Sequence, residues 1–301
     1  MNLFYLNNSH YCVPLAWASK VFIFLYRLRL DACKFCLYSL CVIAFQISAQ
    51  TLQQELNDLP IINVNIASMD FPPNAHQSKD GRVSGKSIET IRAFCTVSRM
   101  NCEIIIYPTA RAYMTIENRT SDVLLTANIS TFEQCCTYSQ WSYSFIAGII
   151  TELPIDNTSI NEATLEGQSL VMVRGWQSIY DAFPNLKNLV AAGKVELIET
   201  SSTASAIKIY NTDRASLLWG ANIFEWYFDK LSMQWDKKSF KPMVVSDAGI
   251  WVSKESMHHK HIVNRFNLAY QLLKEQGNLG QDNFLVPALM EQVYIEAATP
   301  N

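Results

Sequence analysis

The stretch YPTARAYMTIENRTSDVLLTANISTFEQC, residues 107–135, contains the alternation of elements that decides the fold class. Residues 110–119 place apolar side chains at helical spacing, and residues 122–127 form the short apolar run of a buried strand. A polar loop follows. Upstream, the sequence predicts a strand at 61–68, a helix at 86–100 and a strand at 102–108. Strands that alternate with helices in this way are typical of an α/β fold with a mainly parallel sheet.

The second half of the chain repeats the same order of elements. We expect strands at 169–175, 194–200 and 214–222, helices at 176–193 (with a break at Pro184) and 202–213, one or two strands within 241–256, and an amphipathic helix at 261–280. No long Gly/Ser linker separates the halves, so we expect crossing strands to join them. The predicted lobes are 50–150 with 246–301, and 151–245.

Residues 1–49 have the organisation of a secretory signal peptide. A basic segment, RLRLDACK, precedes the apolar run FCLYSLCVIAF and the small residue Ala49. The apolar run from Phe35 to Ser48 is shorter than the ~20 residues of a spanning helix, so a membrane anchor is the less favoured alternative. We expect an exported, periplasmic protein that begins near Gln50.

Charge and cysteine content restrict the function classes. The formal net charge is -3, and residues 1–49 contribute +3, so the remainder carries -6 without a basic stripe, which disfavours nucleic acid as a partner. Four cysteines follow the leader, and they predict one or two disulfides in an oxidising compartment, Cys95 to Cys102 being the simplest. The absence of a CxxC pair disfavours zinc, and the histidines of MHHKH (257–261) fit a solvated helix start better than a metal site. We predict no metal and no cofactor.

Three segments resemble a known family: FPPNAHQSKDGRVSGKSIETI (71–91), PTARAYMTIENRTSDVLLT (108–126) and DAGIWVSKES (247–256). In order and spacing they are similar to the bacterial periplasmic solute-binding proteins of family 3, the polar amino-acid binders of ABC importers. The resemblance implies a two-lobed periplasmic-binding-protein type II fold with a ligand cleft between the lobes. It also implies a monomer that binds a small solute, delivers it to an ABC permease or membrane receptor, and catalyses no reaction.

The sequence departs from this family at two binding positions. The family clamps the ligand carboxylate with an Arg in a Thr-x-x-Arg pattern, and here TFEQ places Gln134 there. A late acidic residue that takes the ligand ammonium would fall near LLWGAN, which contains Asn222 but no carboxylate. A neutral amide loses the charge-assisted pair. An ordinary zwitterionic amino acid is therefore a poor guess for the ligand.

The loops at the carboxyl ends of the predicted strands supply the candidate ligand contacts. Arg111 could bind a carboxylate or stack on a ring; alternatively, it could pair with Glu117 or Asp122, or simply face the solvent. Phe71 and Trp176 could hold a ring, or belong to the core. The full set of predicted contacts is Asp70, Phe71, Arg111, Thr126, Asn128, Ser130, Gln134, Trp176, Gln177, Ser178 and Asn222.

Two further readings of the function stay open at this point. An enzyme on the same scaffold, similar to periplasmic dehydratases, would need a paired acid and base in the cleft, and Asp70 with Arg111 is the nearest pair available. The other alternative is a protein that presents its ligand to a sensory receptor. Solute capture for an importer is the leading hypothesis.

Overall fold

The computed structural model describes residues 54, 56, 59–152, 160–233, 240–287 and 289. All of them belong to one compact unit that spans residues 52–301. The predicted leader, residues 1–49, lies outside the described residues. Within the described part of the chain, no helix is long and apolar enough to cross a membrane.

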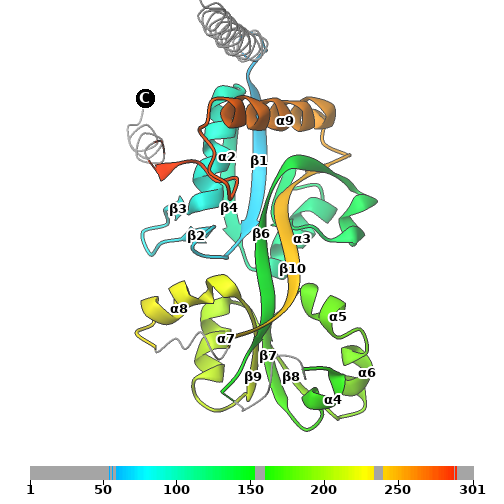
Figure 1. Cartoon of the computed structure of the whole chain (residues 1–301). Helices are drawn as coiled ribbons and strands as arrows, with labels where there is room; N and C mark the ends of the chain where they lie inside the picture. Colours follow the sequence, from blue (N-terminus) through cyan, green and yellow to red (C-terminus); the bar gives the residue numbers. More distant parts are fainter. Residues whose placement is uncertain are drawn as a thin grey trace, which may run out of the picture. The chain divides into compact units, whose positions relative to one another are not determined.

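One eight-stranded sheet organises the protein (Figure 1). Strand β1 pairs in parallel with β4 and β5 in the first lobe, and β7 pairs in parallel with β8 and β9 in the second. Along the sheet the strands are β4 (Met100–Tyr107), β1 (Ile62–Met69), β5 (Val123–Ala127), β10 (Phe240–Ser253), β6 (Cys136–Ile150), β9 (Leu217–Ala221), β7 (Ser169–Val173) and β8 (Glu196–Thr200). The α/β prediction is confirmed.

Two long antiparallel strands, β6 and β10, connect the lobes (Figure 1). They pair with each other from Cys136 opposite Ser253 to Ile150 opposite Phe240. At one end β10 also pairs with β5, and at the other end β6 pairs with β9. Crossing strands were expected, and they are present. Their antiparallel pairs make the sheet mixed, where the sequence predicts a mainly parallel one.

Helices α2 (Lys86–Val97), α3 (Thr109–Glu117) and α9 (His259–Glu275) belong to the first lobe. Helix α2 begins after Gly85, whose φ of 129° and close approach to the Asn74 carbonyl exclude a Cβ atom. The helix buries Ile88, Ile91 and Phe94, and the predicted disulfide from Cys95 to Cys102 ties it to β4. A second disulfide joins the adjacent Cys135 and Cys136.

The second lobe has shorter helices around its strands. The predicted helix at 176–193 is broken at Pro184, as expected, because proline cannot donate the backbone hydrogen bond that would continue the helix. The elements are α4 (Glu162–Leu165), α5 (Ser178–Ala182), α6 (Leu186–Ala191), α7 (Thr203–Tyr210), the 3₁₀ turn η2 (Asn222–Phe224) and α8 (Glu225–Lys230).

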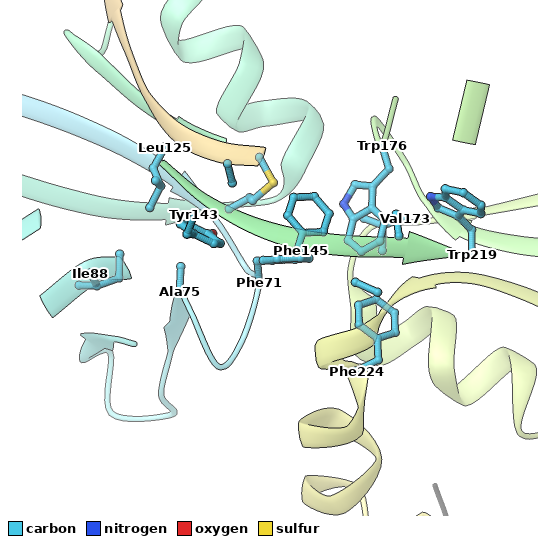
Figure 2. Close-up of a cluster of buried hydrophobic side chains, with 14 of the residues drawn as sticks. Phe71, Ala75, Ile88, Leu125, Tyr143, Phe145, Val173, Trp176, Trp219 and Phe224 are labelled. Carbon is cyan, nitrogen blue, oxygen red and sulfur yellow. The ribbon is translucent and has the colours of Figure 1, made fainter. Parts of the chain in front are cut away.

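A single cluster of buried apolar side chains extends through both lobes. Figure 2 shows its central part, where Ile88 and Tyr143 lie on the side of the first lobe and Trp219 and Phe224 on the side of the second. Apolar side chains therefore form a continuous contact between the lobes.

Candidate functional site

A pocket lies where β1, β5 and β7 reach their carboxyl ends. In open α/β sheets this edge is the usual place for a ligand. The pocket is lined by Ser68, Met69, Phe71, Ala75, Tyr113, Leu125, Thr126, Ala127, Ile129, Tyr143, Phe145, Trp176, Gln177, Ser178 and Ala248. Its walls thus come from the first lobe, from both crossing strands and from the loop after β7. Its cavity of about 50 Å³ has space for only a few water molecules.

Aromatic rings form a continuous chain across this region (Figure 2). The Phe71 ring packs edge-on against Phe145 at 5.2 Å and against Trp176 at 5.8 Å, measured between centroids. Trp176 in turn contacts Phe224 at 5.6 Å. Pairs with this geometry contribute about 0.5–1.5 kcal/mol beyond the area they bury. Phe71 and Trp176 therefore hold the two lobes together as well as lining the pocket.

Two buried hydroxyl groups on neighbouring strands line the pocket with only long hydrogen bonds. The Ser68 hydroxyl donates to the Met69 carbonyl at 3.5 Å, and the Thr126 hydroxyl lies 3.4 Å from the Tyr113 hydroxyl. Good O–H···O hydrogen bonds are 2.5–3.0 Å long. Ser68 is 1% exposed and Thr126 is 3% exposed, so both residues are almost fully buried. Both groups retain capacity to bond a ligand.

The two tyrosines of the pocket stay neutral. Burial raises the pKa of Tyr113 to about 12, although a hydrogen bond with Thr126 opposes this effect. Burial also raises the pKa of Tyr143, against hydrogen bonds with Asn74 and Ser87. Both phenols therefore act as neutral hydrogen-bonding groups at physiological pH.

Beside the pocket, Asp70 forms a polar contact between the lobes. The Tyr227 hydroxyl of α8 donates to the Asp70 carboxylate at 2.6 Å. Burial raises the pKa of Asp70 above its ordinary value, while the Tyr227 hydrogen bond and the positive charges of His76 and Lys230 oppose the increase. Burial and Lys230 lower the pKa of His76. The His76 ring also packs on Trp226 at 5.4 Å, so this cluster joins both lobes a second time.

The structure brings five of the predicted contacts together around the pocket: Phe71, Thr126, Trp176, Gln177 and Ser178. The Ser178 hydroxyl accepts a hydrogen bond from the Trp219 indole at 3.2 Å, and the exposed Gln177 side chain donates to the Gly175 carbonyl at 3.3 Å. Asp70 directly precedes Phe71 but turns toward Tyr227. No ligand contact of these residues is tested by the structure, so each stays a prediction.

The other predicted contacts are exposed and are not part of the lining. Asn128 binds the Asp247 carbonyl through its backbone, and the Asn222 side chain accepts from the Ile146 amide at 3.1 Å. The Gln134 carbonyl accepts from the Lys254 ammonium at 3.3 Å. Ser130 opens the 3₁₀ turn η1 (Ser130–Glu133).

Arg111 does not reach the pocket. It is exposed on α3, and its guanidinium stacks on the Tyr107 ring, 5.2 Å from the ring centroid. Among the described residues it forms no ion pair with Glu117 or Asp122; Asp122 accepts hydrogen bonds from the Asn65 amide and the Ser256 hydroxyl instead. The role of Arg111 as a ligand anchor stays a prediction: in the structure its side chain is exposed and stacks on Tyr107, the last residue of β4.

Several pocket residues were not predicted from the sequence. Phe145 and Tyr143 lie in β6, whose polar and aromatic alternation gives a weak strand signal, and they reach the pocket only because that strand crosses between the lobes. Ser68 and Tyr113 carried a detectable signal: Ser68 is a polar residue in an otherwise apolar strand end, and Tyr113 is on the helix of the opening segment.

The acid and base named for the enzyme alternative, Asp70 and Arg111, form no pair with each other among the described residues. Asp70 is bonded to Tyr227, and its proposed partner Arg111 lies on an exposed surface. No group of three or more His, Cys, Asp or Glu side chains in the described part of the chain is placed to hold a metal ion. His259, one of the MHHKH histidines, lies 2.9 Å from the Thr137 hydroxyl.

Comparisons with solved structures identify the architecture. A histidine-bound substrate-binding protein of an ABC uptake transporter from Streptococcus pneumoniae aligns with a TM-score of 0.60 at 14% identity, covering 78% of this chain and 97% of that one. The chain has the fold of the periplasmic binding proteins. A histidine kinase sensor domain described as similar to periplasmic binding proteins aligns with a TM-score of 0.58 at 14% identity, covering 78% and 95% of the two chains.

The glutamate-bound GluR0 ligand-binding core from Nostoc punctiforme has the same periplasmic-binding-protein fold. It aligns with a TM-score of 0.54 at 17% identity, covering 79% of this chain and 100% of that one. No protein-family model matches the sequence, and no curated protein does. The similarity thus confirms the predicted two-lobed type II fold.

Proposed function

We propose that this protein is an exported solute-binding protein that captures a small molecule between its lobes and delivers it to an ABC importer. The observation that carries the proposal is the composition of the pocket wall, which combines the ends of β1 and β5, the crossing strands and the Trp176 loop of the second lobe. A ligand enclosed by both lobes gains contacts only when they close, and this difference in affinity drives closure. The fold that this chain shares with substrate-binding proteins supports the same function.

The proposed lobes are residues 50–150 with 246–301, and residues 151–245, with bending in β6 and β10. Binding needs no covalent step, and we propose none. Export through the segment 1–49 would place the protein in the periplasm, where a membrane permease can meet its closed form.

The function is tested by thermal-shift screening of the purified protein against amino acids, organic acids, amines, sugars, short peptides and neutral aromatic compounds. A compound that binds only the native state raises the melting temperature with its concentration. A hit whose shift disappears in Trp176→Ala, but persists in Lys187→Ala on the exposed side of α6, would support capture in this pocket. Persistence of the shift in Trp176→Ala would place the binding elsewhere and contradict the proposal.

A second candidate is presentation of the ligand to a sensory receptor, and the similarity to a kinase sensor domain favours it as the runner-up. Both roles use the same closure. Reconstituted vesicles that contain a candidate permease and its ATPase separate them: solute-dependent ATP hydrolysis on addition of the loaded protein supports import, and activation of a receptor without transport supports sensing.

A further inference from the structure

The chemistry of the pocket also restricts the class of solute, and this inference rests on the proposed function. Most lining side chains are apolar, and the rest are neutral: none of the lining residues within the described chain is Asp, Glu, Lys, Arg or His. The rings of Phe71, Phe145 and Trp176 form one wall. An ion buried against these rings would lose its hydration without an opposite charge to replace it.

Two titratable groups directly adjoin pocket residues in the chain: His76, next to Ala75, lies 3.1 Å from the Ser84 hydroxyl, and the exposed Asp247, next to Ala248, accepts the Ser144 hydroxyl. Three more charged groups close to pocket residues in the chain are also engaged or face solvent. Asp70 accepts the Tyr227 hydroxyl, and Arg174, two residues before Trp176, is exposed and lies 3.6 Å from Glu199. Arg111 stacks on Tyr107 on the outer face of α3. Recruiting any of them would cost an existing contact or a rearrangement of the backbone.

The hydroxyls of Ser68 and Thr126 supply the polar part of the recognition. Both are almost fully buried, both line the pocket, and their hydrogen bonds in this structure are long. Each hydroxyl can donate one hydrogen bond and accept others. A neutral hydroxyl, carbonyl or amide of a ligand would satisfy them where the protein itself does not.

We infer that the solute of this site is a small, uncharged, ring-bearing molecule with one neutral hydrogen-bonding group, held by stacking on Phe71, Phe145 and Trp176 and by hydrogen bonds to Ser68 and Thr126. The Phe71 and Trp176 rings belong to opposite lobes and contact each other, with their centroids 5.8 Å apart. A ligand that stacks between them therefore requires these two rings to separate.

Four compounds with one phenol ring and different charges test this inference. We would measure the binding of p-cresol, tyramine, 4-hydroxyphenylacetate and tyrosine by calorimetry, using protein expressed from the full-length gene. They are neutral, cationic, anionic and zwitterionic, respectively, at pH 7. The inference predicts that p-cresol binds at least tenfold more tightly than each of the others, because only p-cresol leaves no charge to desolvate.

Thr126→Val tests the hydroxyl with little change in shape. It should weaken p-cresol binding by about 2- to 10-fold, the equivalent of one hydrogen bond, and leave the binding of toluene unchanged. The matched control is Thr109→Val, which removes an equally buried hydroxyl that is bonded to Met69 but does not line the pocket. If Thr126→Val does not fold, Ser68→Ala gives the same comparison.

The outcomes separate this inference from the proposed function. Tightest binding of tyrosine, or of either singly charged compound, would overturn the neutral-ligand inference and leave solute capture intact. If none of the four binds, the inferred class of neutral phenols is wrong, and the thermal-shift panel then tests the function. A hit from another class of compound preserves solute capture. No hit in the panel overturns both the neutral-ligand inference and the proposed solute capture. If p-cresol binds equally tightly to Thr126→Val, Ser68→Ala and the parent protein, the two hydroxyls do not hydrogen-bond to the ligand.

Discussion

Asp70 illustrates how one residue acquires a different role from the one its position suggests. It follows β1 at the ligand edge of the sheet, where a carboxylate would ordinarily face the solute. In the structure it instead accepts the Tyr227 hydroxyl from the other lobe, and burial raises its pKa. A partly buried carboxylate that resists ionisation makes the stability of the folded protein sensitive to pH.

The sign of the pH effect follows from this raised pKa. Between the ordinary pKa of a carboxyl in the unfolded chain and the raised value in the folded protein, the folded state binds more protons, so the free energy of unfolding falls as pH rises through this interval. Asp70→Asn cannot ionise but can still accept the Tyr227 hydroxyl. We expect that the free energy of unfolding of this variant does not show the fall with pH that Asp70 causes in the parent over this interval.

Urea denaturation at several pH values from 4 to 7 measures the difference. The parent should lose stability relative to Asp70→Asn as pH increases. The Asp70 charge opposes the lowering of the His76 pKa, so the variant lowers that pKa further, and this change acts on the difference between the two proteins in the same direction. Parallel curves for the two proteins would show that the Asp70 pKa does not differ between the folded and unfolded states.

Arg265 is a buried cation with a structural role. It is 2% exposed on α9, and its guanidinium donates to the carbonyls of Pro60, Ser98 and Arg99 at 2.7, 3.2 and 3.1 Å. These carbonyls belong to the segments that enter β1 and β4. The side chain thereby closes hydrogen bonds that neither strand can make by itself.

Arg265→Met should lower the free energy of unfolding by about 2–4 kcal/mol, since buried carbonyls lose charge-assisted partners that the thioether cannot replace. The matched control is Arg111→Met on the exposed face of α3, where a change within about 0.5 kcal/mol is expected. Chemical denaturation of both variants gives the comparison. Equal losses would show that Arg265 contributes no more than a surface arginine.

At the scale of elements, the pair of crossing strands decides whether two lobes exist at all. Both strands are long, and their pairing register shifts between Pro242 and Val244, where β10 passes Gly148 of β6. A Cβ atom at Gly148 would lie 2.1 Å from the Lys241 carbonyl oxygen. The irregularity thus depends on a residue without a side chain.

Gly148→Ala should therefore destabilise the protein by about 1–3 kcal/mol, because the methyl group meets backbone that cannot move without breaking the strand pair. Gly280→Ala provides the control: its Cβ would lie 2.9 Å from a side-chain oxygen of Asp282, which can rotate away, and at an ordinary contact distance of 3.7 Å from the Phe284 carbonyl oxygen. Thermal unfolding of the two variants measures the difference. A Gly148→Ala protein as stable as Gly280→Ala would contradict the close approach of these strands.

At the scale of the molecule, two kinds of contact join the lobes directly. The Asp70 to Tyr227 hydrogen bond and the packing of Phe71 on Trp176 both join groups on opposite sides of the pocket. Such contacts favour a closed form before binding and so reduce the affinity difference that a ligand must supply.

Tyr227→Phe keeps the ring and removes the hydroxyl. We expect the unliganded protein to shift toward more open forms, by the equivalent of about 0.5–3 kcal/mol for one hydrogen bond to a carboxylate or its protonated form. Small-angle X-ray scattering should report a larger radius of gyration. Tyr210→Phe, a buried tyrosine of α7 in the same lobe, should leave it unchanged. Identical scattering from Tyr227→Phe and the parent would show that this contact does not hold the lobes.

The sequence by itself determined the elements and their order. The periodicity of apolar residues and the positions of Gly and Pro predicted β1, α2, β4, α3 and β5, and the break at Pro184. These signals depend on residues that are close together in the chain. The Cys95 to Cys102 disulfide was predictable for the same reason: it closes a short helix-to-strand connection. The loops around Phe71 and Trp176 followed from the rule that strand ends carry ligand sites.

The tertiary structure alone decided which side chains share the pocket. The stacking of Arg111 on Tyr107, for example, depends on how α3 packs against β4. Phe145 lines the pocket because β6 crosses between the lobes. Asp70 accepts a hydrogen bond from Tyr227, which lies 157 residues away in the sequence. Local patterns cannot contain these relations, because burial and partnership between distant residues depend on how the lobes pack. The same packing made the pocket apolar and left Ser68 and Thr126 as its poorly satisfied polar groups.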